Sequence, residues 1–183
     1  MHTDAGHLLV PLARAAIGSE LGRAAPAPAD AEWLLAPGAT FVTLTRDGQL
    51  RGCIGTLAAH RPLAEDVTAN AIAAAFRDPR FKPLTDDEFV TVRIEVSLLS
   101  PAEPLNCEDE AGALAQLRPG IDGVIFQYGH HRSTFLPQVW AQLPDRTEFL
   151  AQLKYKAGLP PDFWSSEAKL SRYTVSKWCE TDS

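Results

Sequence analysis

The chain has 183 residues, of which 45% are hydrophobic and 22% charged, as is typical of a globular protein that buries a sizeable core. Its formal net charge is -6, with 23 acidic and 17 basic residues and no run of lysine or arginine, which argues against a general binder of nucleic acids or anionic membranes. This length fits one domain, residues 1–183, in which residues 1–30 are predicted to form an N-terminal helix and a linker.

The three cysteines, Cys53, Cys107 and Cys179, are widely spaced and odd in number. The sequence shows neither a cleavable signal peptide nor an apolar run long enough to cross a membrane. Together these features predict a cytoplasmic protein with free thiols and no membrane partner.

The first third of the chain predicts a helix from Thr3 to Gly22 and then a short, stiff linker over residues 25–30. Two antiparallel strands are expected next, at Phe41–Arg46 and Gln49–Ile54. Asp47-Gly48 lies between these β-favouring runs, and Asp-Gly at such a place is a strong signal for a hairpin turn.

The second of these strands brings a charged group, a thiol and two glycines together in the segment Leu50–Gly55. Because residues two apart on a strand share a face, Arg51 and Cys53 are predicted to point the same way. A guanidinium beside a thiol favours the thiolate, which is the nucleophilic and metal-binding form. Gly52 and Gly55 permit a bulge or the close approach of a ligand. The structural alternative is that Cys53 is a small core residue and that both glycines serve only the bulge.

Pro62 opens the next predicted helix, because proline is favoured at the first helical position, and Asp78-Pro79 ends it. Glu65 and Asp66 fall in the first turn of this helix, where acidic side chains interact favourably with the helix dipole.

The connector after this helix is polar and carries Arg77, Arg80 and Phe81, which are further candidates for the functional site. The alternative is that an arginine at the helix end simply pairs with Asp78. The segment Thr85-Asp86-Asp87-Glu88 then forms a capping-box pattern that starts one short helical turn.

The second half of the chain repeats the order of the first. Its predicted elements are a strand at 90–98, a short helix at 110–117, a hairpin at 121–128 and 132–136, a helix at 145–158 and a last strand at 170–178. Each hairpin carries an arginine early in its second strand, Arg51 and Arg132, and each is followed by a proline and helices. This order predicts two related strand-strand-helix units that share one sheet.

A cysteine nucleophile needs a base or a cationic neighbour, and His60, His130 and His131 are the candidates for a base. The last two lie at or near a turn, where histidines are more often plain surface residues. The usual zinc and deaminase patterns do not occur, and no metal site is predicted. No nicotinamide, flavin or nucleotide motif is found, and no cofactor is predicted.

Five segments, in this order, resemble the AMMECR-one domain family, whose bacterial members are also called AmmeMemoRadiSam system protein A. They are LRGCIGT, AIAAAFRDPRFKPLT, IEVSLLSP, TFLPQVW and FLAQLKYKAGLP. The resemblance spans about Leu8 to Trp178. It implies an α+β fold in two lobes, with a duplicated unit around a mixed, barrel-like β-sheet flanked by helices. It also implies partners, since members of this family occur with Memo-like and radical S-adenosylmethionine proteins.

Two functional hypotheses follow. In the first, the chain is an accessory or binding component of a modification system, and the LRGCIG hairpin is its functional surface. In the second, it is an enzyme in which Cys53 is a thiolate nucleophile and Arg51 holds a carboxylate or phosphate of the substrate. Both hypotheses place the same further residues at the binding surface: Gly52, Gly55, Arg77, Arg80, Phe81 and Arg132.

Overall fold

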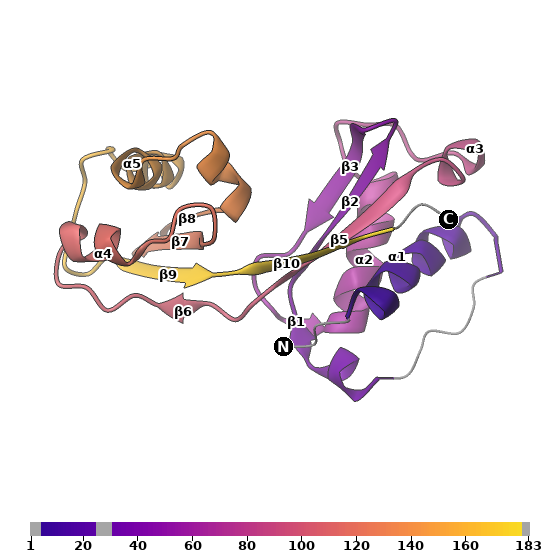
Figure 1. Cartoon of the computed structure of the whole chain (residues 1–183), viewed down its shortest axis with the longest axis horizontal. Coiled ribbons are helices and arrows are strands. Elements are labelled where there is room, and N and C mark those ends of the chain that lie inside the picture. The colour runs from indigo at the N-terminus through magenta and orange to yellow at the C-terminus, as the bar shows by residue number, and fades with distance from the viewer. Residues whose placement is uncertain (1–4, 25–30, 181–183) are drawn as a thin grey trace. The chain divides into compact units, whose positions relative to one another are not determined.

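The computed structural model describes residues 5–24 and 31–180 (Figure 1). Its helices are α1 (Gly6–Glu20), α2 (Leu63–Phe76), α3 (Asp86–Phe89), α4 (Glu110–Gln116) and α5 (Arg146–Lys156), with short 3-10 helices at η1 (Glu32–Leu35) and η2 (Pro137–Ala141). The predicted start of the first helix at Thr3 and the linker at 25–30 lie outside the described residues.

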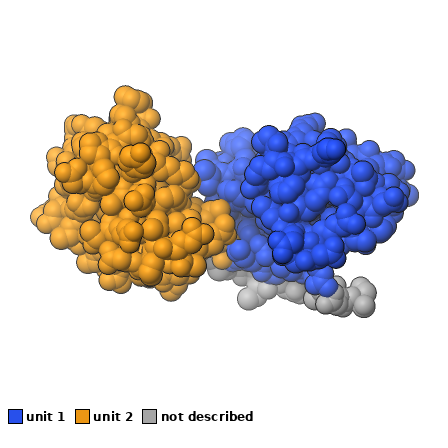
Figure 2. Space-filling model, turned by 90° about the horizontal axis from the view of Figure 1, so that it is seen from above, with its two compact units in different colours: residues 1–99, 176–183 blue, residues 100–175 orange. Residues whose placement is uncertain are grey.

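The strands of the described residues form two four-stranded sheets and one two-stranded pair. They are β1 (Pro37–Gly38), β2 (Thr40–Arg46), β3 (Gln49–Gly55), β4 (Arg61–Pro62), β5 (Arg93–Leu99), β6 (Glu103–Pro104), β7 (Gly123–Tyr128), β8 (His131–Phe135), β9 (Lys169–Tyr173) and β10 (Val175–Cys179). Figure 2 colours the two compact units into which the chain divides: unit 1 holds residues 1–99 and 176–183, and unit 2 holds residues 100–175.

Unit 1 is built on a sheet with the strand order β10-β5-β2-β3. The central strands pair Val42 with Val96 and Leu44 with Ile94, and all four side chains are buried. Their apolar face packs against α1 and α2, whose alanines allow a close approach to the sheet. The hairpin β2–β3 lies at one side of this sheet, so that β3 is an edge strand.

Unit 2 has its own sheet, in the order β6-β9-β7-β8, and its own core. The ring of Trp140 stacks on Phe149 with 3.6 Å between centroids. In the same unit, the ammonium of Lys154 is buried and lies 2.6 Å from Glu110 Oε1 and 2.8 Å from the carbonyl of Phe163. This ion pair joins α5 to α4.

The structure confirms the α+β class and both predicted hairpins. The predicted sharing of one sheet is wrong, because each hairpin lies in a separate four-stranded sheet, and the sheets stay open within the described residues instead of closing into a barrel. The predicted repeat is nevertheless present in the order in which the elements of each unit are connected. In both units a hairpin is followed by a helix, and a later strand then pairs with the first strand of the hairpin.

The last predicted strand, 170–178, is in fact two strands that belong to different sheets. β9 pairs with β7 in unit 2, whereas β10 joins the sheet of unit 1 beside β5. Thr174 separates them, and its N–H donates to Ser100 Oγ at 2.9 Å. Side-chain periodicity cannot reveal such a division, since both halves are extended.

Candidate functional site

The hairpin turn is formed by two residues in the left-handed region of the backbone map. Asp47 has φ 51° and Gly48 has φ 73°, as expected for the Asp-Gly turn that joins twisted antiparallel strands. Beyond the turn the register shifts: Thr45 faces Leu50, whereas Leu44 already faces Gly52. Arg51 is therefore the extra residue of a β-bulge.

The side chains of Arg51 and Cys53, which were predicted to point the same way, have different partners. Arg51 contacts Glu88 and Lys82, whereas the thiol of Cys53 contacts Thr43.

Both glycines of the motif are required by packing. A Cβ atom on Gly52 would lie 2.2 Å from the carbonyl oxygen of Ala74 in α2, far inside van der Waals contact. A Cβ atom on Gly55 would lie 2.3 Å from the ring of Phe41. The glycines thus let a helix and an aromatic ring lie directly on β3.

Arg51 is held by a bidentate ion pair. Its Nε and Nη2 donate to the two carboxylate oxygens of Glu88 at 3.0 and 2.8 Å, and Nη2 also donates to the carbonyl of Lys82 at 3.0 Å. Hydrogen bonds from Arg51 hold the pKa of Glu88 at about 2, well below its usual range. Glu88 belongs to α3, whose capping box with Thr85 is confirmed. The arginine therefore ties the hairpin to this short helix.

Cys53 lies on the edge strand and is half-buried. Its Sγ is 3.3 Å from Thr43 Oγ1 on the neighbouring strand. Its backbone N–H donates to Asp78 Oδ2 at 2.9 Å, and its carbonyl accepts from Arg80 Nη2 at 3.3 Å. The guanidinium that touches the Cys53 residue is thus that of Arg80 and not that of Arg51.

Asp78 and Arg80 form an ion pair that satisfies the backbone N–H and carbonyl of Cys53 on the edge strand β3. Arg80 Nη2 lies 2.7 Å from Asp78 Oδ2, and its Nε lies 3.0 Å from Oδ1. Hydrogen bonds from Arg80 lower the pKa of the buried Asp78 carboxyl, and those same bonds raise the pKa of Arg80. The ring of Phe81 lies 5.8 Å from the Arg51 guanidinium and 5.5 Å from that of Arg80. Four of the predicted residues, Arg51, Cys53, Arg80 and Phe81, are therefore neighbours.

A buried polar network behind the motif was missed by sequence reasoning. Asp66 is fully buried in the first turn of α2, and its carboxylate accepts hydrogen bonds from the backbone N–H and hydroxyl of Thr40, the hydroxyl of Thr56, Nε of Arg61 and Nδ2 of Asn70, at 2.7 to 3.0 Å. The network joins the last residue of LRGCIGT to the helix. The available signal was the spacing of Asp66 and Asn70, which places two polar groups one turn apart on an otherwise apolar face.

The model of the AMMECR1 family matches residues 10–178 of this chain. The chain belongs to the AMMECR1 family. A protein of Methanothermobacter thermautotrophicus is 43% identical over 135 residues, covering 73% of this chain and 70% of that relative. A protein of Thermococcus gammatolerans is 40% identical over 182 residues, covering 93% and 87%. Among solved structures, that of the uncharacterized protein PH0010 from Pyrococcus horikoshii is similar, with a TM-score of 0.80, 36% identity, and coverage of 96% and 91%.

Two other predicted site residues of this AMMECR1 protein are exposed. Arg77 is exposed at the C-terminal end of α2, and Arg132 is exposed on β8 of unit 2. Of the candidate bases, His60 is exposed with its Nδ1 2.8 Å from the carbonyl of Ala58. His131, whose ring is tilted by 33° from that of its neighbour His130 in unit 2, has its Nδ1 2.9 Å from the carbonyl of Ala157.

The described residues of this AMMECR1 protein hold neither a metal-binding cluster nor a membrane-spanning helix. Within the described ranges, 5–24 and 31–180, no three histidine, cysteine or carboxylate side chains gather closely enough to hold a metal ion. Across the same residues no helix combines the length and apolarity needed to span a bilayer.

Proposed function

We propose that this AMMECR1 protein is an accessory or binding component of a cytoplasmic modification system and that it acts through the hairpin surface. The hairpin surface is defined here as residues 50–55 of β3 together with residues 78–82. The observation that carries the proposal is the pairing of Arg51 with Glu88: Nε and Nη2 of the guanidinium are engaged, and Nη1, which has no partner among the described residues, is buried out of reach of a substrate anion.

The hairpin surface has the composition of a contact site. Leu50 is 43% exposed, and the side chain of Arg80 is 53% exposed beside the partly buried ring of Phe81. Arginine and aromatic side chains are the residues that most often dominate binding energy at protein interfaces. Internal ion pairs hold this surface in place before any partner arrives, which lowers the ordering cost of association.

The family resemblance supplies the candidate partners, a Memo-like protein and a radical S-adenosylmethionine protein. The acidic net charge of -6 favours a protein partner over a nucleic acid.

The proposal is tested by isothermal titration of the chain with a purified Memo-like protein and a radical S-adenosylmethionine protein from the same genome. Wild type is expected to bind at least one of them, and Leu50→Asp is expected to weaken that binding about thirtyfold, since a charge buried at an interface core costs about 2 kcal/mol or more. Ile121→Asp is the matched control, because Ile121 is an equally exposed apolar residue in unit 2. Equal affinity of wild type and Leu50→Asp would contradict the proposal.

The second candidate function is catalysis by Cys53, with Arg51 holding an anionic group of the substrate. One observation favours it: the half-exposed guanidinium of Arg80 lies against the Cys53 backbone, so a cation is close to the thiol. In this candidate Arg51 must release Glu88 before it can bind a substrate.

A further inference from the structure

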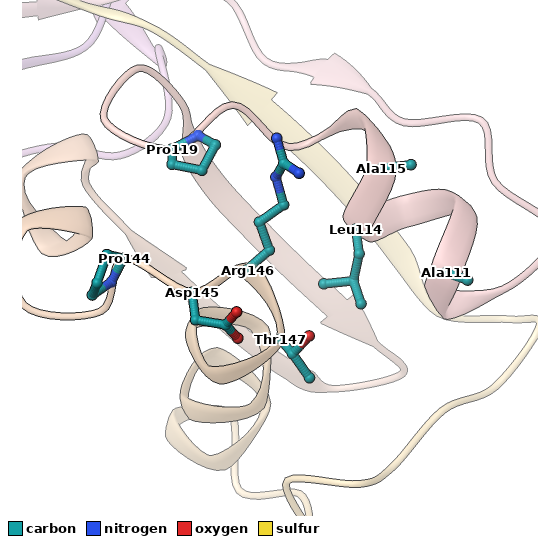
Figure 3. A pocket seen from close by; sticks show the side chains of 8 residues that line it. All are labelled: Ala111, Leu114, Ala115, Pro119, Pro144, Asp145, Arg146 and Thr147. Carbon is teal, nitrogen blue, oxygen red and sulfur yellow. The ribbon is translucent and has the colours of Figure 1, made fainter.

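A hollow of about 680 Å³ opens on the surface of unit 2 (Figure 3). It lies between α4 and the start of α5 and is lined by Ala111, Leu114, Ala115, Pro119, Pro144, Asp145, Arg146 and Thr147. None of these residues belongs to the hairpin surface, which lies in unit 1. The volume is comparable with the range of about 300–1,000 Å³ that is usual for small-molecule sites, but the hollow is open to solvent, since all its lining residues except Leu114 are exposed.

Most of the lining is apolar and stiff. α4 contributes Leu114 and two alanines, whose short side chains leave the space open, and a proline stands at each of the two loops that border the hollow. Proline rings and alanines lose little side-chain entropy when a ligand covers them. These walls suit a small branched hydrocarbon body.

The polar end of the hollow is formed by Arg146. Its Nε donates to the carbonyl of Leu117 at 2.9 Å, which fixes the plane of the guanidinium. Within the described part of the chain, no partner is found for its two terminal nitrogens. Figure 3 shows the side chain extending from α5 along the hollow toward Pro119. An anchored guanidinium with free terminal N–H groups is suited to bidentate recognition of a carboxylate.

We propose that this hollow binds a small organic carboxylate with an apolar body. The carboxylate would accept hydrogen bonds from the terminal nitrogens of Arg146, and the hydrocarbon would lie on Leu114 and its neighbouring alanines. Asp145 disfavours a doubly charged phosphate more than a singly charged carboxylate, because its own carboxylate lines the same hollow and repels the larger negative charge more strongly. Asp145 Oδ1 also accepts a hydrogen bond from the N–H of Glu148 at 3.0 Å, so the N-terminus of α5 is already capped. The group that binds the ligand's carboxylate is therefore the guanidinium of Arg146.

The test uses saturation-transfer NMR with isovalerate, its uncharged analogue isovaleramide and inorganic phosphate, each titrated into the full chain. Isovalerate is expected to bind with a dissociation constant of about 1–10 mM, as suits so small a ligand. Isovaleramide and phosphate are each expected to bind at least about tenfold more weakly, because loss of a charge-assisted hydrogen bond typically costs that much or more. Equal binding of isovaleramide, stronger binding of phosphate, or no binding of isovalerate at about 10 mM would overturn the proposal.

Substitutions in and outside the hollow test whether isovalerate binds there. Arg146→Gln is expected to weaken isovalerate binding at least about tenfold, whereas Lys169→Gln, which removes an exposed cation from the same unit, should leave it unchanged. Ala115→Phe places a ring in the hollow from an exposed position that tolerates substitution, and it should also abolish binding if the chain stays folded. Isovalerate binding that survives in both Arg146→Gln and Ala115→Phe would exclude this site. Because the hollow and the hairpin surface lie in different units, either proposal can fail without the other.

Discussion

Replacing Asp66 with alanine is expected to lower the free energy of unfolding by about 3–5 kcal/mol, which is the usual cost of removing one partner of a buried ion pair. The substitution would remove the acceptor for groups on Thr40, Thr56, Arg61 and Asn70 at once. Donors left unsatisfied in the interior retain their full desolvation cost. Urea unfolding followed by circular dichroism measures the change directly.

Glu65→Ala is the matched control, because Glu65 is an exposed acidic residue in the same turn of α2. It is expected to change the free energy of unfolding by less than about 0.5 kcal/mol. If Asp66→Ala were no more costly than Glu65→Ala, the carboxylate would not be the centre of this network.

Gly52→Ala is expected to destabilise the chain by about 3 kcal/mol, at the upper end of the range for overpacked cores. The added methyl group would lie 2.2 Å from the carbonyl oxygen of Ala74, so either α2 or β3 has to move. A clash with backbone is costly, because no rotamer change relieves it. Thermal and urea unfolding of the variant measure the loss.

Gly48→Asn supplies a control in the same hairpin. Gly48 has φ 73° with no atom near an added Cβ, and asparagine tolerates this left-handed conformation, so a loss below about 1 kcal/mol is expected. Gly52, unlike Gly48, does not have a positive φ, so a loss for Gly52→Ala as small as that for Gly48→Asn would show that the contact with α2 does not require glycine at position 52.

Local chemistry made much of the fold predictable. The turn at Asp47-Gly48 and the capping box at Thr85 depend on residues within a few positions of each other, and both are present as expected. The assignment of strands to sheets depends on pairing between distant segments. Periodicity therefore identified β9 and β10 as extended chain, but it revealed neither their division nor the two separate sheets.

The candidate site shows the same contrast. The motif predicted that Arg51 and Cys53 act together, because alternation along a strand is a local rule. In the structure the arginine is instead paired with Glu88, which lies 37 positions away in the sequence. Partners at such distances, like those of Asp66, follow from how helices pack on the sheet. Nothing in one sequence reveals them.

Whether Arg51 activates the thiol of Cys53 is tested most directly by the alkylation rate of Cys53 with iodoacetamide. The rate is compared in wild type and Arg51→Ala, with mass spectrometry to separate Cys53 from Cys107 and Cys179. We predict rates within about twofold of each other, because the guanidinium of Arg51 lies against Glu88 and not against the thiol. A fall of about tenfold or more in a folded Arg51→Ala chain would contradict this account and would identify Cys53 as a thiol activated by Arg51.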